Sequence, residues 1–187
     1  MKKDNDIFNK SSEYINYKIK DILDAVSQDD INKVKKLFFK SKRVFVYGAG
    51  RSGLVARAFA IRLVHLGFQT FVIGETIGAP VKKDDLVFIV SGSGETITSV
   101  MTAEIARDIG AKLVVVTGEK NARINRFADV IIVLSAACQD TEKKKLAPLG
   151  TLFEASVWIL LDAIVAMLMD SKGETEKTMQ SRHATLQ

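Results

Sequence analysis

The residues best suited to chemistry in this chain lie in the segment SGSGET, which runs from Ser91 to Thr96. It follows an apolar run, Leu86–Val90, and precedes residues with helical spacing. Backbone N–H groups at the start of such a helix, with the hydroxyls of Ser91, Ser93 and Thr96, can hold a phosphate through the helix dipole and hydrogen bonds. We therefore expect a monophosphate site here, although a tight turn capped by Ser93 would explain the same residues. Glu95 lies inside the loop and must turn toward hydroxyls of the ligand or a helix N-terminus to avoid the phosphate.

A second glycine-rich segment, GAGRSG, follows the apolar run Val44–Tyr47. Its glycines have the G-x-G-x-x-G spacing of dinucleotide-binding loops, and Glu75 lies about where a ribose-binding acid would follow. Close packing of a strand against a helix requires the same spacing. As alternatives to ligand binding, Arg51 could be an exposed arginine in a turn and Ser52 could cap the following helix. Three residues of this loop are candidates to contact a phosphorylated ligand: Gly50, Arg51 and Ser52.

Neither loop is typical of a nucleoside triphosphate site. No lysine follows the glycines as a Walker motif requires, and no strand-end acid is placed to hold Mg²⁺. The two loops follow separate apolar runs, and the carboxyl ends of parallel strands form one crevice in an open α/β sheet. We therefore expect a single crevice that binds a sugar phosphate, with a dinucleotide as the alternative ligand.

The elements that must position these loops are predicted from apolar periodicity. Apolar residues recur at helical spacing over Ile7–Val26 and Ile31–Phe39, and helices over Ser52–Leu66 and Thr96–Ile109 would cross between strands. The expected class is α/β, a three-layer, flavodoxin-like doubly wound fold with an N-terminal helical pair and a C-terminal apolar helix. Five runs without polar alternation predict its parallel sheet, buried on both faces: Val44–Tyr47, Thr70–Ile73, Leu86–Val90, Leu113–Val116 and Val130–Leu134.

The C-terminal helix is predicted over Thr151–Met169 and is apolar nearly all round, so we expect it to pack between the sheet and another subunit. Its apolar stretch is shorter than a membrane span, which favours a buried helix over a membrane anchor. Residues 135–150 before it are predicted to form a polar loop, and residues 171–187 a polar tail. The whole chain, 1–187, is expected to be one domain with a helical extension over 1–40.

Composition and charge exclude several other classes of protein. With 187 residues, 47% hydrophobic and 26% charged, the chain can bury one sizeable core. The net charge is +5, and the basic residues that produce it are scattered along the chain. The run Lys143-Lys144-Lys145 is more typical of a solvated loop than of a nucleic-acid patch. The single Cys138 excludes an internal disulfide, and two histidines supply too few ligands for a Cys/His metal site. The polar N-terminus lacks a signal-peptide core, so we expect a cytoplasmic protein that binds no nucleic acid, membrane or metal.

Four segments together resemble the 6-phospho-3-hexuloisomerases, a single-domain branch of the sugar isomerase (SIS) family. These segments are YGAGRSGLVARAFAIRLVHLGF, SGSGETIT, APLGTLFEASVWILLDAIV and the closing RHATLQ. The resemblance extends from the opening helices to the last residues. It implies interconversion of 3-hexulose 6-phosphate and fructose 6-phosphate in the ribulose monophosphate pathway, without a cofactor.

The resemblance also implies a catalytic pair. It places a catalytic carboxylate in GTLFE, which makes Glu154 the expected base, and it makes His183 the expected second group, since imidazole titrates near neutrality. From the residues alone, Thr151 and Glu154 would instead form a T-x-x-E capping box, and a histidine in a polar tail would be incidental. The rival histidine, His65, precedes Gly67 at a predicted helix end, where a capping or dipole role accounts for it.

The family resemblance further suggests that the tail reaches the pocket of a neighbouring subunit. We therefore expect a homodimer or homotetramer with active sites at subunit interfaces. Three other functions stay open: an aldose-ketose isomerase of the same family, a regulator that binds phosphosugars without converting them, and a nicotinamide-dependent enzyme. The first forty residues are short and plainly amphipathic, which disfavours an attached DNA-binding module.

Overall fold

The computed structural model describes residues 2–135 and 141–185. Within them, five parallel strands form one sheet in the order β2-β1-β3-β4-β5. This order confirms the predicted flavodoxin-like fold, in which the direction of strand addition reverses between β1 and β3. The strands are β1 (Val44–Gly48), β2 (Thr70–Val72), β3 (Leu86–Ser91), β4 (Lys112–Thr117) and β5 (Val130–Val133).

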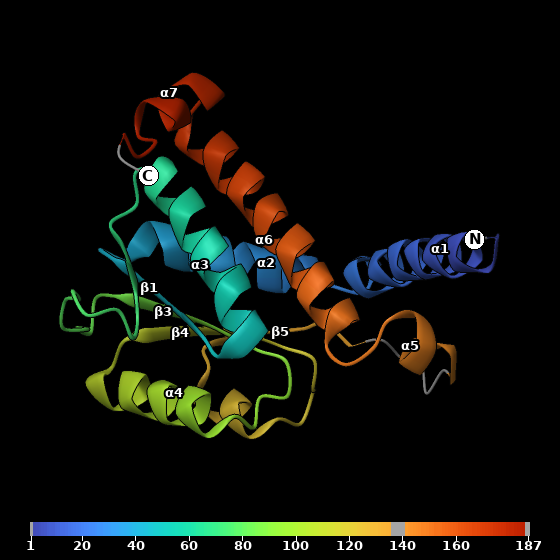
Figure 1. Cartoon of the computed structure of the whole chain (residues 1–187). Coiled ribbons are helices and arrows are strands. Elements are labelled where there is room, and N and C mark those ends of the chain that lie inside the picture. Colours follow the sequence, from blue (N-terminus) through green and yellow to red (C-terminus); the bar gives the residue numbers. More distant parts are fainter. Residues whose placement is uncertain (1, 136–140, 186–187) are drawn as a thin grey trace.

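Helices cover both faces of the sheet and complete the three layers (Figure 1). One face carries α2 (Gln28–Lys40), α3 (Gly50–His65) and α6 (Thr151–Lys172), and the other carries α4 (Ile97–Ile109) and the 3-10 helix η1 (Arg123–Phe127). The remaining helices are α1 (Lys2–Asp24), which projects sideways from the domain, α5 (Thr141–Leu146) and α7 (Glu176–Ser181).

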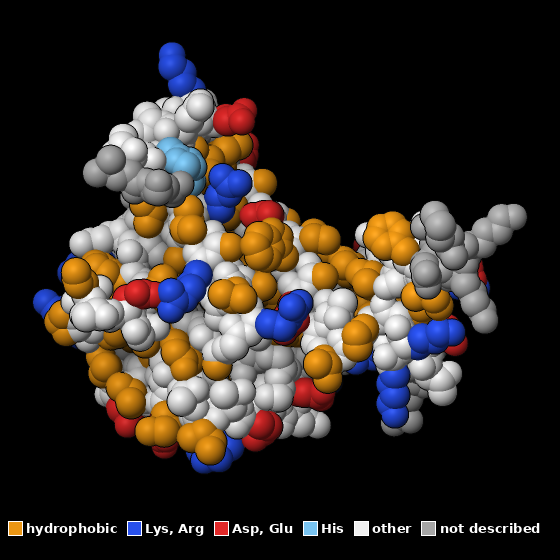
Figure 2. Space-filling model, viewed as in Figure 1, with side chains coloured by type: hydrophobic (Ala, Val, Ile, Leu, Met, Phe, Trp, Pro, Cys, Tyr) orange, Lys and Arg blue, Asp and Glu red, His pale blue; other side chains and the backbone are white. Residues whose placement is uncertain are grey.

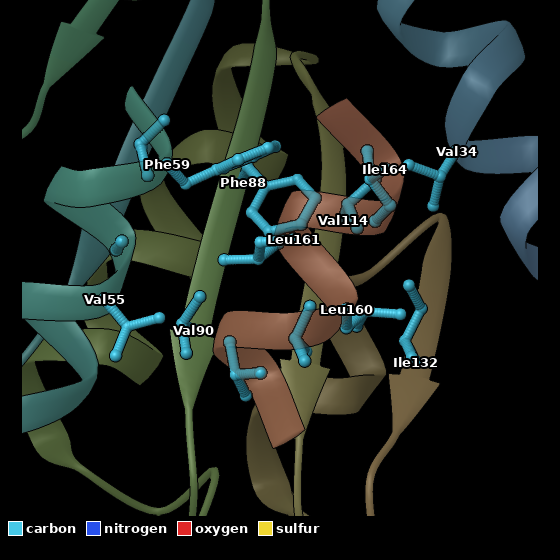
Figure 3. Close-up of a cluster of buried hydrophobic side chains, with 14 of the residues drawn as sticks. Val34, Val55, Phe59, Phe88, Val90, Val114, Ile132, Leu160, Leu161 and Ile164 are labelled. Atoms are coloured by element: carbon cyan, nitrogen blue, oxygen red, sulfur yellow. The ribbon is translucent and has the colours of Figure 1, made fainter. Parts of the chain in front are cut away.

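Strand residues alternate between two apolar cores because successive side chains point to opposite faces of a sheet. In β3, Phe88 and Val90 belong to the core beneath α3 and α6, whereas Val87 and Ile89 belong to the core above α4. Figure 3 shows Phe88 pointing toward Phe59 of α3, and their ring centroids are 5.1 Å apart. Burial on both faces explains why the strands read as continuous apolar runs.

The apolar helix α6 is the one helix in the described residues that is long and apolar enough to cross a bilayer by length and composition. Its inner side is instead buried in the core, as Leu160, Leu161 and Ile164 show in Figure 3. On its outer side, Trp158 and Ile159 are 48% and 47% exposed. The prediction of a core helix is thus confirmed for the inner side, and the outer side faces away from this chain.

Two segments predicted to be irregular contain helices instead. Residues 135–150 include α5, which is anchored by the buried Leu146 and followed by the buried Ala147. Residues 136–140, with Cys138, lie outside the described residues. The predicted polar tail includes α7, which begins with a capping box between Thr175 and Thr178.

The C-terminal segment is also tied to the domain by one arginine. Arg182 donates a hydrogen bond to the carbonyl oxygen of His65 at 3.0 Å, and it pairs with Glu174 at 2.9 Å. Both contacts lie near the end of α3, so the chain folds back onto this end of the domain after α6.

Candidate active site

The two glycine-rich loops meet at one cavity beyond the carboxyl ends of β1 and β3. These strands are neighbours, with Gly48 opposite Val90. The cavity has a volume of about 330 Å³, and its lining includes Ser52 from the first loop and Ser93 from the second. This cavity lies at the point where the strand order reverses, which is where open α/β sheets bind ligands.

Close packing between β1 and α3 requires two of the glycines in the first loop. A Cβ atom added at Gly53 would lie 2.6 Å from the carbonyl oxygen of Gly48, and one added at Gly48 would lie 2.8 Å from the nitrogen of Gly53. Strand β1 and helix α3 therefore approach backbone to backbone. This contact explains the first and last glycines of the G-x-G-x-x-G pattern without a dinucleotide, and the positive φ of 57° explains Gly50.

Three helices begin beside the cavity without a side chain that caps them. The N-cap residues of α3, α4 and α6 are Ala49, Thr96 and Gly150, and none makes a side-chain capping hydrogen bond. The alternative role of Ser52 as the cap of α3 is therefore wrong, as is that of Ser93 for α4. Uncapped first turns leave backbone N–H donors and partial positive charge available to an anion.

The second loop presents its polar groups in different directions. Ser93 and Thr96 are exposed, and the hydroxyl of Ser93 accepts a hydrogen bond from the backbone nitrogen of Glu95 at 3.2 Å. The carboxylate of Glu95 accepts from the backbone nitrogen of Arg123 at 2.7 Å, so it turns toward the start of η1. Ser91 is buried, and its hydroxyl has no partner among the described residues.

The first turn of α6 brings a shielded carboxylate to the same cavity. The side chain of Glu154 is 14% exposed, and its Oε2 lies 2.5 Å from Nε of Arg51, which is 73% exposed. The alternative capping box is wrong, because Gly150 is the N-cap and the hydroxyl of Thr151 donates to the carbonyl of Pro148 at 2.6 Å. Arg51 follows Gly50, the first residue of α3, and so links the first loop to Glu154.

The expected second catalytic group, His183, does not approach Glu154 within this chain. Its ring stacks on that of His65, with centroids 4.8 Å apart, in a cavity that Arg62 and Met169 also line. Glu154 and Met169 are separated by about 22 Å along α6, given the rise of a helix. Burial, aided by the charges of His183 and Arg62, lowers the pKa of His65 below its usual 6.5.

Sequence reasoning missed several residues that line this cavity, and two of them bear on its charge and shape. Lys143 on α5 lines it, whereas the lysine run on sequence alone indicates a solvated loop. A signal existed, because the apolar Leu146 follows three residues later on the same helical face. Gly150 is the second of these residues. A Cβ atom there would lie 2.9 Å from Oε1 of Glu154, and the sequence alone does not predict that contact.

A different cavity, of about 320 Å³, lies on the α4 side of the sheet. Its lining is mostly apolar and includes Phe45, Phe71 and Ile105, and neither glycine loop contributes to it. The cavity between the loops is therefore the candidate active site. Across residues 2–135 and 141–185, no cluster of three His, Cys, Asp or Glu side chains could hold a metal ion.

Comparison with known proteins agrees with this geometry. Residues 37–153 match the SIS domain, and the match includes both glycine loops. The chain belongs to the SIS domain family. A protein of Archaeoglobus fulgidus is 40% identical over 178 residues, covering 94% of this chain and 97% of the relative. The 3-hexulose-6-phosphate isomerase of Bacillus subtilis is 33% identical, covering 95% of this chain and 100% of the relative.

A solved structure extends the comparison to three dimensions. A protein from Methanococcus jannaschii, whose crystal structure infers a molecular function of 3-hexulose-6-phosphate isomerase, superimposes with a TM-score of 0.86. It is 29% identical, and the alignment covers 95% of this SIS chain and 99% of the other. The similarity therefore extends over nearly the whole length of both chains.

Proposed function

We propose that this SIS protein interconverts 3-hexulose 6-phosphate and fructose 6-phosphate. The observation that carries the proposal is the shielded carboxylate of Glu154, which lines one cavity with serines from two glycine loops. Relatives named 3-hexulose-6-phosphate isomerase that align with most of the chain support the same reaction. A phosphorylated sugar as substrate fits an enzyme that works in the cytoplasm.

The reaction moves a carbonyl group from C3 to C2 of the sugar and needs no net oxidation. A base removes the proton from C2, the electrons form a C2–C3 enediol, and a proton is returned to C3 while the oxygen protons rearrange. Glu154 is the base in this scheme, because a carboxylate can take the proton and give it back from one position. Arg51 holds that carboxylate at the cavity.

The phosphate is bound by the loop between β3 and α4 in this proposal. The uncapped start of α4 supplies backbone donors, and Ser93 and Thr96 supply exposed hydroxyls. Glu95 is already engaged with the backbone of Arg123, which keeps its charge directed away from an anion in the loop. Gly50 and Ser52 bind the sugar end from the first loop. Ser91 supports the loop from beneath.

We infer that the enzyme works as a homodimer or homotetramer with active sites at subunit interfaces. Large apolar side chains are exposed on the outer sides of α3 and α6, and Figure 2 shows hydrophobic atoms gathered over these helices. The groove between them is lined by Leu54, Trp158 and Ile159 and reaches Glu154. His183 lies at the far end of α6, so it serves the site of a neighbouring subunit in this proposal.

An assay of fructose 6-phosphate formation from 3-hexulose 6-phosphate tests the reaction. Purified wild-type protein should convert the substrate, and in deuterium oxide the product should gain solvent deuterium at C3. The Glu154→Gln variant should lose at least about a hundredfold in kcat while keeping its fold. Full activity in this variant would move the base to another residue.

The same assay separates the other candidate functions. Turnover of an aldose phosphate alone would point to another SIS isomerase. Sugar-phosphate binding without turnover would point to a regulator, and a rise in melting temperature with NAD alone would point to a nicotinamide enzyme.

Mixing two inactive variants tests the role of His183 in a neighbouring site. Glu154→Gln and His183→Ala proteins should each be inactive, and subunit exchange should restore up to about a quarter of wild-type activity if each site combines two chains. No recovery after demonstrated exchange would place both groups, or neither, in one subunit's site.

A further inference from the structure

One lysine of α5 reaches the candidate active site, whereas the other two lysines of this helix are exposed. Lys143 of α5 is half-buried and lines the cavity together with Ser93 and Glu154. Its neighbours Lys144 and Lys145 are exposed and do not line it. Among the described residues that form the lining, Lys143 is the one basic side chain, and Glu119 and Glu154 are the acidic ones.

The ammonium group of Lys143 is held at this position by the turn that precedes α6. Its Nζ donates a hydrogen bond to the carbonyl oxygen of Leu149 at 3.0 Å. Leu149 has a φ of 55°, the one positive φ at a non-glycine residue in the described part of the chain, and is followed by Gly150, the N-cap of α6. A lysine ammonium has three N–H donors, and the bond to Leu149 uses one.

A phosphate in this cavity would gain from a full positive charge in addition to the backbone donors of the glycine loops. The phosphate dianion would share a partly enclosed space with the carboxylates of Glu119 and Glu154, and backbone dipoles provide only partial charges. Arg51 is the other nearby cation, but its Nε pairs with Glu154 and it lines the adjoining groove. Lys143 is thus the full positive charge that faces the cavity itself.

We propose that Lys143 binds the phosphate group of the substrate, while its bond to Leu149 fixes the turn that begins α6. This inference rests on the proposed function for the identity of the sugar. The binding step itself concerns any phosphate monoester that enters the cavity.

The test compares Lys143→Gln with Lys144→Gln, which removes the same charge from the same helix. Calorimetric titration with inorganic phosphate and with fructose 6-phosphate should show about tenfold weaker binding for Lys143→Gln and a change below about twofold for Lys144→Gln. In the isomerase assay, KM should rise by a similar factor with kcat nearly unchanged. Lys143→Arg keeps the charge and should recover most of the affinity.

The Leu149→Gly variant separates the effect of the charge of Lys143 on phosphate binding from its effect on the turn before α6. Glycine adopts a positive φ without strain, so Leu149→Gly should relax the turn that Lys143 holds. Lys143→Gln in the Leu149→Gly background should still weaken phosphate binding by about the same factor. The proposal is overturned if Lys143→Gln lowers kcat but leaves the phosphate Kd unchanged, or if Lys144→Gln weakens binding equally.

These outcomes also separate this inference from the proposed function. Phosphate titration requires no turnover. A wild-type protein that binds phosphate through Lys143 yet fails to isomerise the hexulose phosphate would refute the proposed function and leave the lysine assignment intact.

Discussion

The carboxylate of Glu154 lies against the backbone of Gly150, in the space that a side chain at residue 150 would fill. A Cβ atom there would be 2.9 Å from Oε1 and 3.2 Å from Cδ of Glu154. Gly150 is also the N-cap of α6, with φ of −84°, so its backbone conformation does not itself require glycine. The small residue is therefore explained by the position of the carboxylate.

Replacing Gly150 with alanine should separate activity from stability. The added methyl group meets the end of a flexible side chain, so Glu154 should move and kcat should fall by about tenfold or more. The free energy of unfolding should change by less than about 1 kcal/mol, because the backbone can accept alanine. Steady-state kinetics and urea unfolding measure the two effects.

A matched control for this substitution is Gly78→Ala. A Cβ atom at Gly78 would meet only the carbonyl oxygen of Glu75, at 3.9 Å, and the residue does not line the cavity between the loops. Its kcat should equal that of the wild type. If Gly150→Ala also kept wild-type kcat, the position of Glu154 would not matter for the reaction.

The fold and the general place of the site were predictable because they depend on strong local signals. Uninterrupted apolar runs identify strands buried on both faces, and glycine loops after two of them identify the crevice. The contacts of Thr151 were not predictable. Its side chain fits a capping box on sequence alone, but the turn at Leu149 makes Gly150 the N-cap and directs the hydroxyl to Pro148.

The C-terminal helices show the same limit of local reasoning. α5 contains three consecutive lysines, and only the buried Leu146 marks its inner face. α7 has no buried residue, and Arg182 ties the chain after it to His65, a partner more than a hundred residues away in sequence. Tertiary contacts of this kind override weak helix signals, and a single sequence does not contain them.

Two of the three glycines of the first loop, Gly50 and Gly53, should differ in their tolerance of alanine. Gly53→Ala places a Cβ atom 2.6 Å from a backbone oxygen that cannot move freely, so it should destabilise the fold by about 3 kcal/mol. Gly50→Ala meets no atom within 4 Å and should cost about 1 kcal/mol, for its positive φ of 57° alone. Denaturant unfolding of both variants measures this order, and equal losses would contradict the backbone contact between β1 and α3.

Arg51 should matter for catalysis more than for stability. Its side chain is 73% exposed, so Arg51→Met should change the free energy of unfolding by less than about 1 kcal/mol. Loss of its bond to Glu154 should lower kcat by about tenfold, because the carboxylate is no longer held in one orientation.

Arg57→Met is the control for this substitution. Arg57 lies on the same helix and pairs with Glu75 instead of Glu154, so the variant removes an equal charge and should retain wild-type kcat. Equal losses in the two variants would show that the charge of α3, and not the orientation of Glu154, controls the rate.

The stacked pair of His65 and His183 should make stability depend on pH in the weakly acidic range. Burial lowers the pKa of His65 in the folded state below 6.5, so the unfolded state binds more protons between these two pKa values. The contribution of His65 is therefore complete above about pH 6.5 and is lost as the pH falls through the folded pKa. His65→Gln should therefore flatten the fall in the free energy of unfolding between about pH 7 and pH 5. In this range Asp129 and Glu174, whose pKa values are lowered in the folded state, remain ionised.

The His183→Gln variant removes one cause of the lowered pKa of His65 but keeps burial and Arg62. It should therefore reduce the slope of stability against pH less than His65→Gln does. Urea unfolding at several pH values measures these slopes, and an unchanged slope in His65→Gln would assign the acid sensitivity to other groups.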